Sequence, residues 1–81
     1  MKALYFGRLG DTMGVEEEIL SPPEDVSTTG ELRIWLDQRS GTEGALLEPT
    51  VRIAVNSEFV SDDYAFELGD EIAFLPPVGG G

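Results

Sequence analysis

The chain has 81 residues, which is enough for one small domain with a single hydrophobic core. It contains no cysteine and no histidine, which excludes disulfides, Cys/His zinc sites and nucleophile systems built on these residues. The 16 acidic and 5 basic residues give a net charge of −11, which argues against binding to nucleic acids or to anionic membrane surfaces. No apolar run is long enough to span a bilayer, so we expect a folded cytoplasmic protein without a bound metal.

The first part of the chain predicts two strands joined by a turn. Residues 2–9 are rich in strand-forming side chains, and the glycines of residues 10–14 indicate a turn-rich break. Residues 15–20 can return as a second strand. Pro22 and Pro23 end it, because proline has no N–H for a sheet and restricts the residue before it.

The helix signal is the clearest in the chain. Thr28 followed by Glu31 fits a capping box, in which the hydroxyl accepts an unpaired backbone N–H and the carboxylate reaches back. The residues that follow form one stripe at helical spacing, made of Leu32, Trp35, Leu36 and Arg39. Gly41 is a plausible end for this helix.

The second half predicts three more strands. Residues 42–50 form a loop before residues 51–56, whose apolar side chains alternate as in a strand. A turn leads into the short strand at residues 59–60. Residues 61–68 are polar and irregular, and residues 71–75 form the last strand.

The predicted order is strand, strand, helix, strand, short strand, strand. This order indicates an α+β fold, a mixed sheet of about five strands with one main helix packed across one face. The first and last strands are the most apolar, so we expect them to be central and parallel neighbours. This is the β-grasp arrangement. We assign it to residues 1–77 and treat residues 78–81 as a flexible glycine tail.

The carboxyl end carries the only chemistry that the sequence suggests. Pro76 and Pro77 force an extended exit from the last strand, and the glycines after Val78 have no side chains. Such an arm could enter a narrow channel and present the Gly81 carboxylate to a reactive centre on another protein. Glycines at an end are often only disordered residues or cloning remnants. Their position directly after a core strand favours the carrier interpretation.

The last fourteen residues, Leu68 to Gly81, resemble the Gly-Asp-Glu-(Val/Ile)-Ala-Phe-x-Pro-Pro-Val-x-Gly-Gly ending of the ubiquitin-like sulfur carriers, most closely the small subunits of molybdopterin synthases. Ala54-Val55-Asn56 resembles an internal segment of that family, and residues 28–36 resemble its single helix. The family usually has arginine where this chain has Gly10.

The resemblance implies a reaction at Gly81. A ubiquitin-activating-like adenylyltransferase would use ATP to adenylate its carboxylate, and sulfur from a persulfide donor would convert it to a thiocarboxylate. The tail residues Val78, Gly79 and Gly80 would enter the large subunit of molybdopterin synthase, where the sulfur attacks the pyranopterin precursor of the molybdenum cofactor. The chain would bind no cofactor stably and would have no active site of its own.

Docking to that large subunit requires an exposed apolar surface. By resemblance, Phe6, Phe59 and Leu75 form a patch on the outer face of the sheet, beside Pro76 and Pro77. The alternative is that these three side chains belong to the core, since strand alternation cannot decide which face is covered. We assign Leu32, Trp35, Leu36, Ile53, Val55 and Ile72 to the core.

Two other functions remain open. The chain could carry sulfur for another pathway, such as the synthesis of thiamine or of a sulfur-containing amino acid. It could also be a β-grasp interaction module whose glycine tail does nothing. The Pro76-Pro77-Val78 sequence favours the molybdopterin pathway, because it is the most pathway-specific feature of the resemblance.

Overall fold

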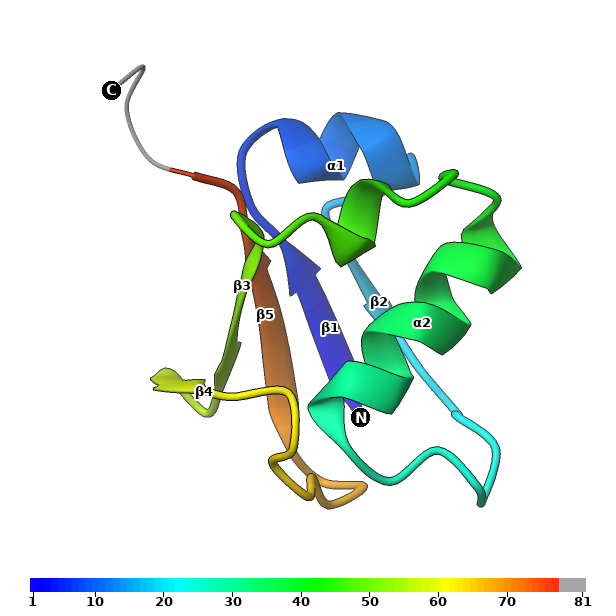
Figure 1. Cartoon of the computed structure of the whole chain (residues 1–81), viewed down its shortest axis with the longest axis vertical. Coiled ribbons are helices and arrows are strands. Elements are labelled where there is room, and N and C mark those ends of the chain that lie inside the picture. Colours follow the sequence, from blue (N-terminus) through cyan, green and yellow to red (C-terminus); the bar gives the residue numbers. More distant parts are fainter. Residues whose placement is uncertain (78–81) are drawn as a thin grey trace.

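The computed structural model of the protein describes residues 1–77. Their elements, in chain order, are β1 (Lys2–Tyr5), α1 (Arg8–Met13), β2 (Glu17–Ile19), α2 (Thr29–Ser40), the 3-10 helix η1 (Ala45–Leu47), β3 (Arg52–Val55), β4 (Glu58–Val60) and β5 (Glu71–Leu75). The strands form one sheet, and α2 lies across one of its faces (Figure 1). No helix in residues 1–77 is long and apolar enough to cross a membrane.

The sheet has the order β2-β1-β5-β3-β4. β1 and β5 pair in parallel, while the other neighbours pair antiparallel. The expected mixed five-stranded sheet is therefore confirmed, including the parallel pairing of the first and last strands. Both of these strands run toward α1, and their carboxyl ends lie on the side of the molecule where α1 lies (Figure 1).

Helix α2 begins and ends as its sequence predicts. The Thr28 hydroxyl accepts a hydrogen bond from the Glu31 amide at 3.2 Å, and the Glu31 carboxylate accepts one from the Thr28 amide at 3.1 Å. Hydrogen bonds to this carboxylate hold the pKa of Glu31 below its ordinary value, led by the one from the Ser27 amide. Gly41 ends the helix in the left-handed conformation, with φ of +65°.

The prediction of a strand at residues 2–9 followed by a turn at 10–14 was wrong in part. β1 ends at Tyr5, and residues 8–13 form the short helix α1. Gly7 breaks the strand with φ of +55°, and Gly14 ends the helix with φ of +80°. The reason for the helix is tertiary, because it buries Leu9 against the end of the core.

One core lies between the sheet and α2. Its buried side chains include the predicted Leu32, Leu36, Ile53, Val55 and Ile72, together with Phe74 and Leu46. Trp35 is only partly buried and packs at the margin of this core, with the Arg39 guanidinium over its ring at 5.3 Å. The second strand is shorter than predicted and the predicted loop at 42–50 contains η1, whose Leu46 adds to the core.

Candidate functional site

The predicted arm begins where β5 leaves the sheet. β5 lies between β1 and β3, so its end is held by a strand on either side. Pro76 follows directly and is partly buried, whereas Pro77 is exposed. The residues predicted to carry the chemistry, Val78, Gly79, Gly80 and Gly81, lie outside the described residues.

The register of the strands defines the outer face of the sheet, the face that α2 leaves uncovered. Residues paired across strands point to the same side, and the pairs Leu4 with Ala73, Ala73 with Ala54, and Ala54 with Phe59 run across the sheet. Their neighbours along each strand, Ile72 and Ile53, point into the core. A continuous apolar row therefore crosses the outer face.

The three side chains predicted for docking lie on this outer face or at its end. Phe6 is 47% exposed and Phe59 is 55% exposed, so neither belongs to the core. Leu75 is half-buried, and its partner in β3 is Arg52. Because Phe6 follows β1 and Leu75 ends β5, the patch extends toward the point where the chain leaves the sheet.

Arg52 is part of this surface and was not singled out from the sequence. Its guanidinium carbon lies 3.8 Å from the centre of the Phe59 ring, a cation–π contact on the outer face. The only sequence signal for it was a charged residue alternating with the apolar residues of β3. The contact places a positive charge beside the apolar side chains of Phe59 and Leu75.

Asn56, the polar residue of the Ala-Val-Asn segment, ties two turns together. Its side-chain oxygen accepts a hydrogen bond from the Glu71 amide at 3.0 Å, and its amide nitrogen donates to Asp70 at 2.9 Å. The Asp70 carboxylate also accepts from the Glu67 amide at 2.8 Å, and these two hydrogen bonds, led by the one from Glu67, lower the pKa of Asp70. Asn56 therefore fixes the start of β5 and has a structural role.

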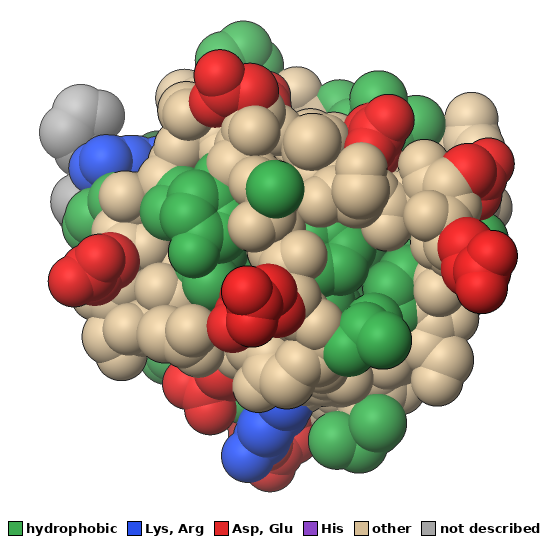
Figure 2. Space-filling view, turned by 90° about the horizontal axis from the view of Figure 1, so that it is seen from below, with side chains coloured by type: hydrophobic (Ala, Val, Ile, Leu, Met, Phe, Trp, Pro, Cys, Tyr) green, Lys and Arg blue, Asp and Glu red, His purple; other side chains and the backbone are tan. Residues whose placement is uncertain are grey.

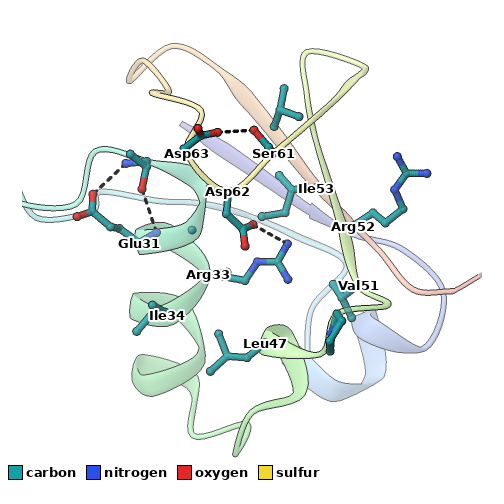
Figure 3. A pocket seen from close by; sticks show the side chains of 14 residues that line it. Glu31, Arg33, Ile34, Leu47, Val51, Arg52, Ile53, Ser61, Asp62 and Asp63 are labelled. Atoms are coloured by element: carbon teal, nitrogen blue, oxygen red, sulfur yellow. Dashed lines mark hydrogen bonds and ion pairs between the residues drawn. The ribbon is translucent and has the colours of Figure 1, made fainter.

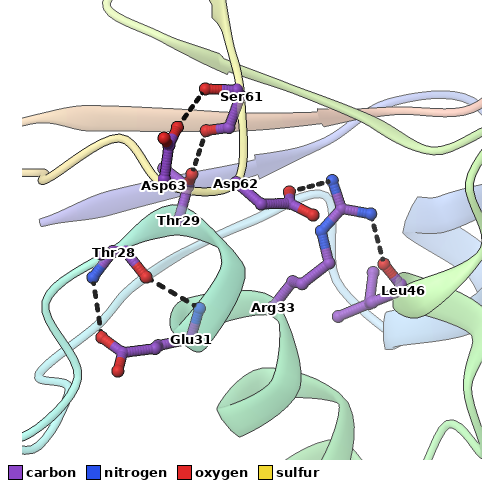
Figure 4. A network of polar contacts seen from close by, with 8 residues as sticks. All are labelled: Thr28, Thr29, Glu31, Arg33, Leu46, Ser61, Asp62 and Asp63. Carbon is purple, nitrogen blue, oxygen red and sulfur yellow. Dashed lines mark hydrogen bonds and ion pairs between the residues drawn. The ribbon is translucent and has the colours of Figure 1, made fainter.

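A hollow lies on the helix side of the molecule, between α2, the segment around Leu47 and residues 60–63 (Figure 3). Arg33 reaches across it. Its guanidinium donates to the Leu46 carbonyl at 3.2 Å and pairs with Asp62 at 3.1 Å (Figure 4). These contacts join α2 to the two segments beside it, so Arg33 acts as a clamp within the fold.

Tyr5 is a further titratable group with a shifted pKa, and it also has a structural role. Burial raises the pKa of Tyr5, and its hydroxyl donates to Glu18 at 2.8 Å. Within residues 1–77 no cluster of three or more acidic side chains is arranged to hold a metal ion. Viewed from below Figure 1, the molecule shows scattered acidic side chains with hydrophobic ones between them (Figure 2).

A sheet in this order with its helix across one face is the ubiquitin-like β-grasp fold. Residues 3–81 match the sequence model of the ThiS family. The chain is 33% identical to the molybdopterin synthase sulfur carrier subunit of Escherichia coli, over 100% of this chain and 99% of that protein. The chain therefore belongs to the ThiS family.

Two solved structures extend this comparison. The putative molybdopterin converting factor subunit 1 of Pyrococcus furiosus is 30% identical, with a TM-score of 0.81 over 95% of both chains. The protein–protein complex of subunits 1 and 2 of the molybdopterin-converting factor from Helicobacter pylori contains a chain that is 26% identical. That chain has a TM-score of 0.67, with 99% of this chain and 96% of that chain covered.

Proposed function

We propose that the chain is the sulfur-carrying small subunit of a molybdopterin synthase. The carboxylate of Gly81 is adenylated, converted to a thiocarboxylate, and donates its sulfur to the pyranopterin precursor of the molybdenum cofactor. The observation that carries the proposal is the full-length similarity to molybdopterin synthase sulfur carrier subunits.

The chemistry of the carrier follows from its activated end. Adenylation converts an unreactive carboxylate into an acyl group with AMP as its leaving group, so that the terminal sulfur of a persulfide donor can displace AMP and form an acyl disulfide. A thiol then attacks the donor's sulfur in this S–S bond, which releases the thiocarboxylate and leaves a disulfide on the donor. The resulting thiocarboxylate is a better nucleophile than the carboxylate at neutral pH. Glycine at positions 79–81 suits this role, since any side chain would crowd the reacting carbonyl.

The partner that receives the sulfur is the large subunit of the synthase. The relative from Helicobacter pylori was solved in complex with subunit 2. The outer-face patch of Phe6, Phe59 and Leu75 is the docking surface, since exposed aromatic side chains are typical anchors of protein interfaces. Val78, Gly79 and Gly80 enter the partner, and Pro76 and Pro77 direct them.

The other partners are an adenylyltransferase that uses ATP and a persulfide enzyme that supplies the sulfur. Both are needed, because the carboxylate does not react with sulfur unless it is activated. The general acids and the binding pocket for the pterin belong to the large subunit. The chain itself is a co-substrate.

Intact-mass spectrometry tests the proposal. The purified chain is incubated with ATP, its cognate adenylyltransferase and a sulfur source, and the expected result is replacement of one oxygen by sulfur at Gly81. A matched chain lacking Gly80 and Gly81 should show no change. An unmodified full-length chain beside an active adenylyltransferase would contradict a carrier function and favour an interaction module.

A second measurement separates the pathways. The thiocarboxylated chain is mixed with the large subunit and the pyranopterin precursor, and formation of the dithiolene product is followed. Sulfur loading without transfer to this precursor would assign the chain to another sulfur-carrier pathway.

A further inference from the structure

The parallel pairing of β1 and β5 brings Gly7 beside Pro76. Tyr5 pairs with Phe74, and the Phe6 amide donates to the Phe74 carbonyl at 3.0 Å, so the pairing continues past the end of β1. Two residues beyond this pair are Gly7 and Pro76. Gly7 follows the end of β1 and Pro76 follows the end of β5.

The two residues lie close together because position 7 has no side chain. A Cβ atom on residue 7 would lie 3.0 Å from the Cγ of Pro76 and 3.8 Å from its Cδ. The first distance is tighter than about nine in ten contacts of real Cβ atoms, so the proline ring would have to shift by a few tenths of an ångström. A side chain at position 7 would therefore displace Pro76.

The backbone conformation of Gly7 and the hydrogen bonds around it fix the position of the surface against which Pro76 lies, which we call the Pro76 seat. Its φ of +55° and ψ of −136° suit glycine and strain every L-residue. The Leu9 amide donates to the Phe6 carbonyl at 3.1 Å, and the Gly10 amide donates to the Gly7 carbonyl at 3.2 Å. Gly7 is thus fixed on one side by β1 and on the other by the first turn of α1.

The position of Pro76 depends on packing against Gly7 more than that of a non-proline residue would. Proline has no backbone N–H, so it cannot be fastened to β1 by donating a hydrogen bond of the sheet. The Pro76 ring lies against Gly7, and the ring itself fixes φ. These two constraints set the direction in which Pro77 leaves the sheet.

We propose that Gly7 is a positioning residue for sulfur transfer, because it seats Pro76 and so directs the arm that ends at Gly81. This inference rests on the proposed function as a sulfur carrier. A reacting group displaced by about 1 Å can lose roughly a hundredfold in rate. A shift of Pro76 moves the point from which the arm enters the partner, and so lowers the fraction of arms that reach the reacting geometry.

The test is a double-mutant cycle of Gly7→Ala and Pro76→Ala in the synthase reconstituted with thiocarboxylated chain. Gly7→Ala should lower kcat by about tenfold or more while KM stays near that of the wild type. Pro76→Ala should also lower kcat, and the double variant should be no slower than the slower single variant, since Gly7→Ala acts by displacing the ring that Pro76→Ala removes.

The matched control is Gly14→Ala. Gly14 also has a positive φ, of +80°, but no atom lies within 4 Å of the point that a Cβ would occupy there. This variant should lose stability, seen as a lower Tm, and keep its kcat. A kcat of Gly7→Ala equal to that of the wild type, or effects that multiply in the double variant, would overturn the inference.

Two further observations keep the test decisive. A wild-type chain that accepts no sulfur refutes the proposed function, whereas an active wild type beside an equally active Gly7→Ala refutes only the positioning role. Should Gly7→Ala fail to fold, NMR of the wild type decides. A nuclear Overhauser contact between the Gly7 Hα and Pro76 Hγ protons is expected, and its absence would contradict the packing of Pro76 against Gly7.

Discussion

Asp37 shows how a single side chain organises a whole loop. It lies near the end of α2, is only 6% exposed, and accepts hydrogen bonds from the Thr42 hydroxyl and from two backbone amides. The amides are those of Gly44 at 2.8 Å and Leu46 at 3.2 Å. Burial by itself would raise the pKa of Asp37, but these three hydrogen bonds lower it below its ordinary value.

This lowered pKa predicts a pH-dependent contribution to stability. A carboxylate whose pKa is lower in the folded state stabilises the fold fully above its ordinary value of 3.8, and this contribution is lost as the pH falls through the folded-state pKa. Asp37→Asn should therefore lower the free energy of unfolding at pH 7 by about 1–3 kcal/mol, because the Gly44 amide then faces a donor. Its stability should also fall less steeply in acid than that of the wild type.

Urea unfolding between neutral pH and pH values below the ordinary Asp range measures both effects. Asp25→Asn is the matched control, since Asp25 is exposed and lies outside this network. Parallel pH profiles for Asp37→Asn and the wild type would show that Asp37 does not contribute.

At the scale of elements, the contact between α2 and residues 61–66 holds the irregular segment of the chain in place. The Gly30 amide donates to the Asp62 carbonyl at 2.7 Å. The Thr29 hydroxyl donates to the Ser61 carbonyl at 2.7 Å (Figure 4). The approach is close because Gly30 has no side chain. A Cβ there would lie 2.9 Å from both the Cβ and the carbonyl oxygen of Asp62.

Gly30→Ala should therefore destabilise the protein, although alanine stabilises an ordinary helix interior relative to glycine by about 1 kcal/mol. The steric conflict with the Asp62 backbone should cost about 1–3 kcal/mol and reverse the sign. Thermal unfolding measures the change, with Gly69→Ala as a control because no atom lies within 4 Å of that position. An increase in Tm for Gly30→Ala would refute the close packing of this segment.

At the scale of the whole molecule, the two faces of the sheet differ in what covers them. The face under α2 holds the core, and the outer face carries the apolar row and the exposed ring of Phe59. In a chain with a net charge of −11, this apolar surface with Arg52 beside the Phe59 ring differs from the acidic remainder. An exposed apolar surface of this kind is typical of protein interaction sites and supports the proposed docking to the large subunit.

Phe59→Ser should weaken binding to the large subunit by at least about tenfold, because an exposed aromatic anchor is lost. Its stability should change by less than about 1 kcal/mol, since more than half of the side chain is already exposed. Isothermal titration calorimetry measures the affinity. Leu68→Ser is the control, as Leu68 is 70% exposed and lies in the segment before β5. Equal affinities for Phe59→Ser and the wild type would place the interface elsewhere.

Local sequence signals predicted a large part of this fold. Local signals were sufficient to predict α2 and β3: the Thr28–Glu31 capping box and Gly41 for the helix, and the alternation of apolar residues for the strand. They sufficed because the interactions they encode join residues a few positions apart. The end of β1 and the whole of α1 were missed. Leu9 stabilises α1 through burial against distant residues, which no local pattern near residues 10–14 indicates.

Part of the candidate site could likewise be predicted from the sequence, and part only from the tertiary structure. The Pro-Pro-Val-Gly-Gly-Gly sequence by itself determined which end of the chain to consider, since the special backbone properties of proline and glycine belong to single residues. Alternation left the two faces of the sheet equivalent, and only the tertiary structure decided that Phe6 and Phe59 face outward. The seat of Pro76 on Gly7 likewise became visible only in three dimensions, because a strand register joins residues almost seventy positions apart.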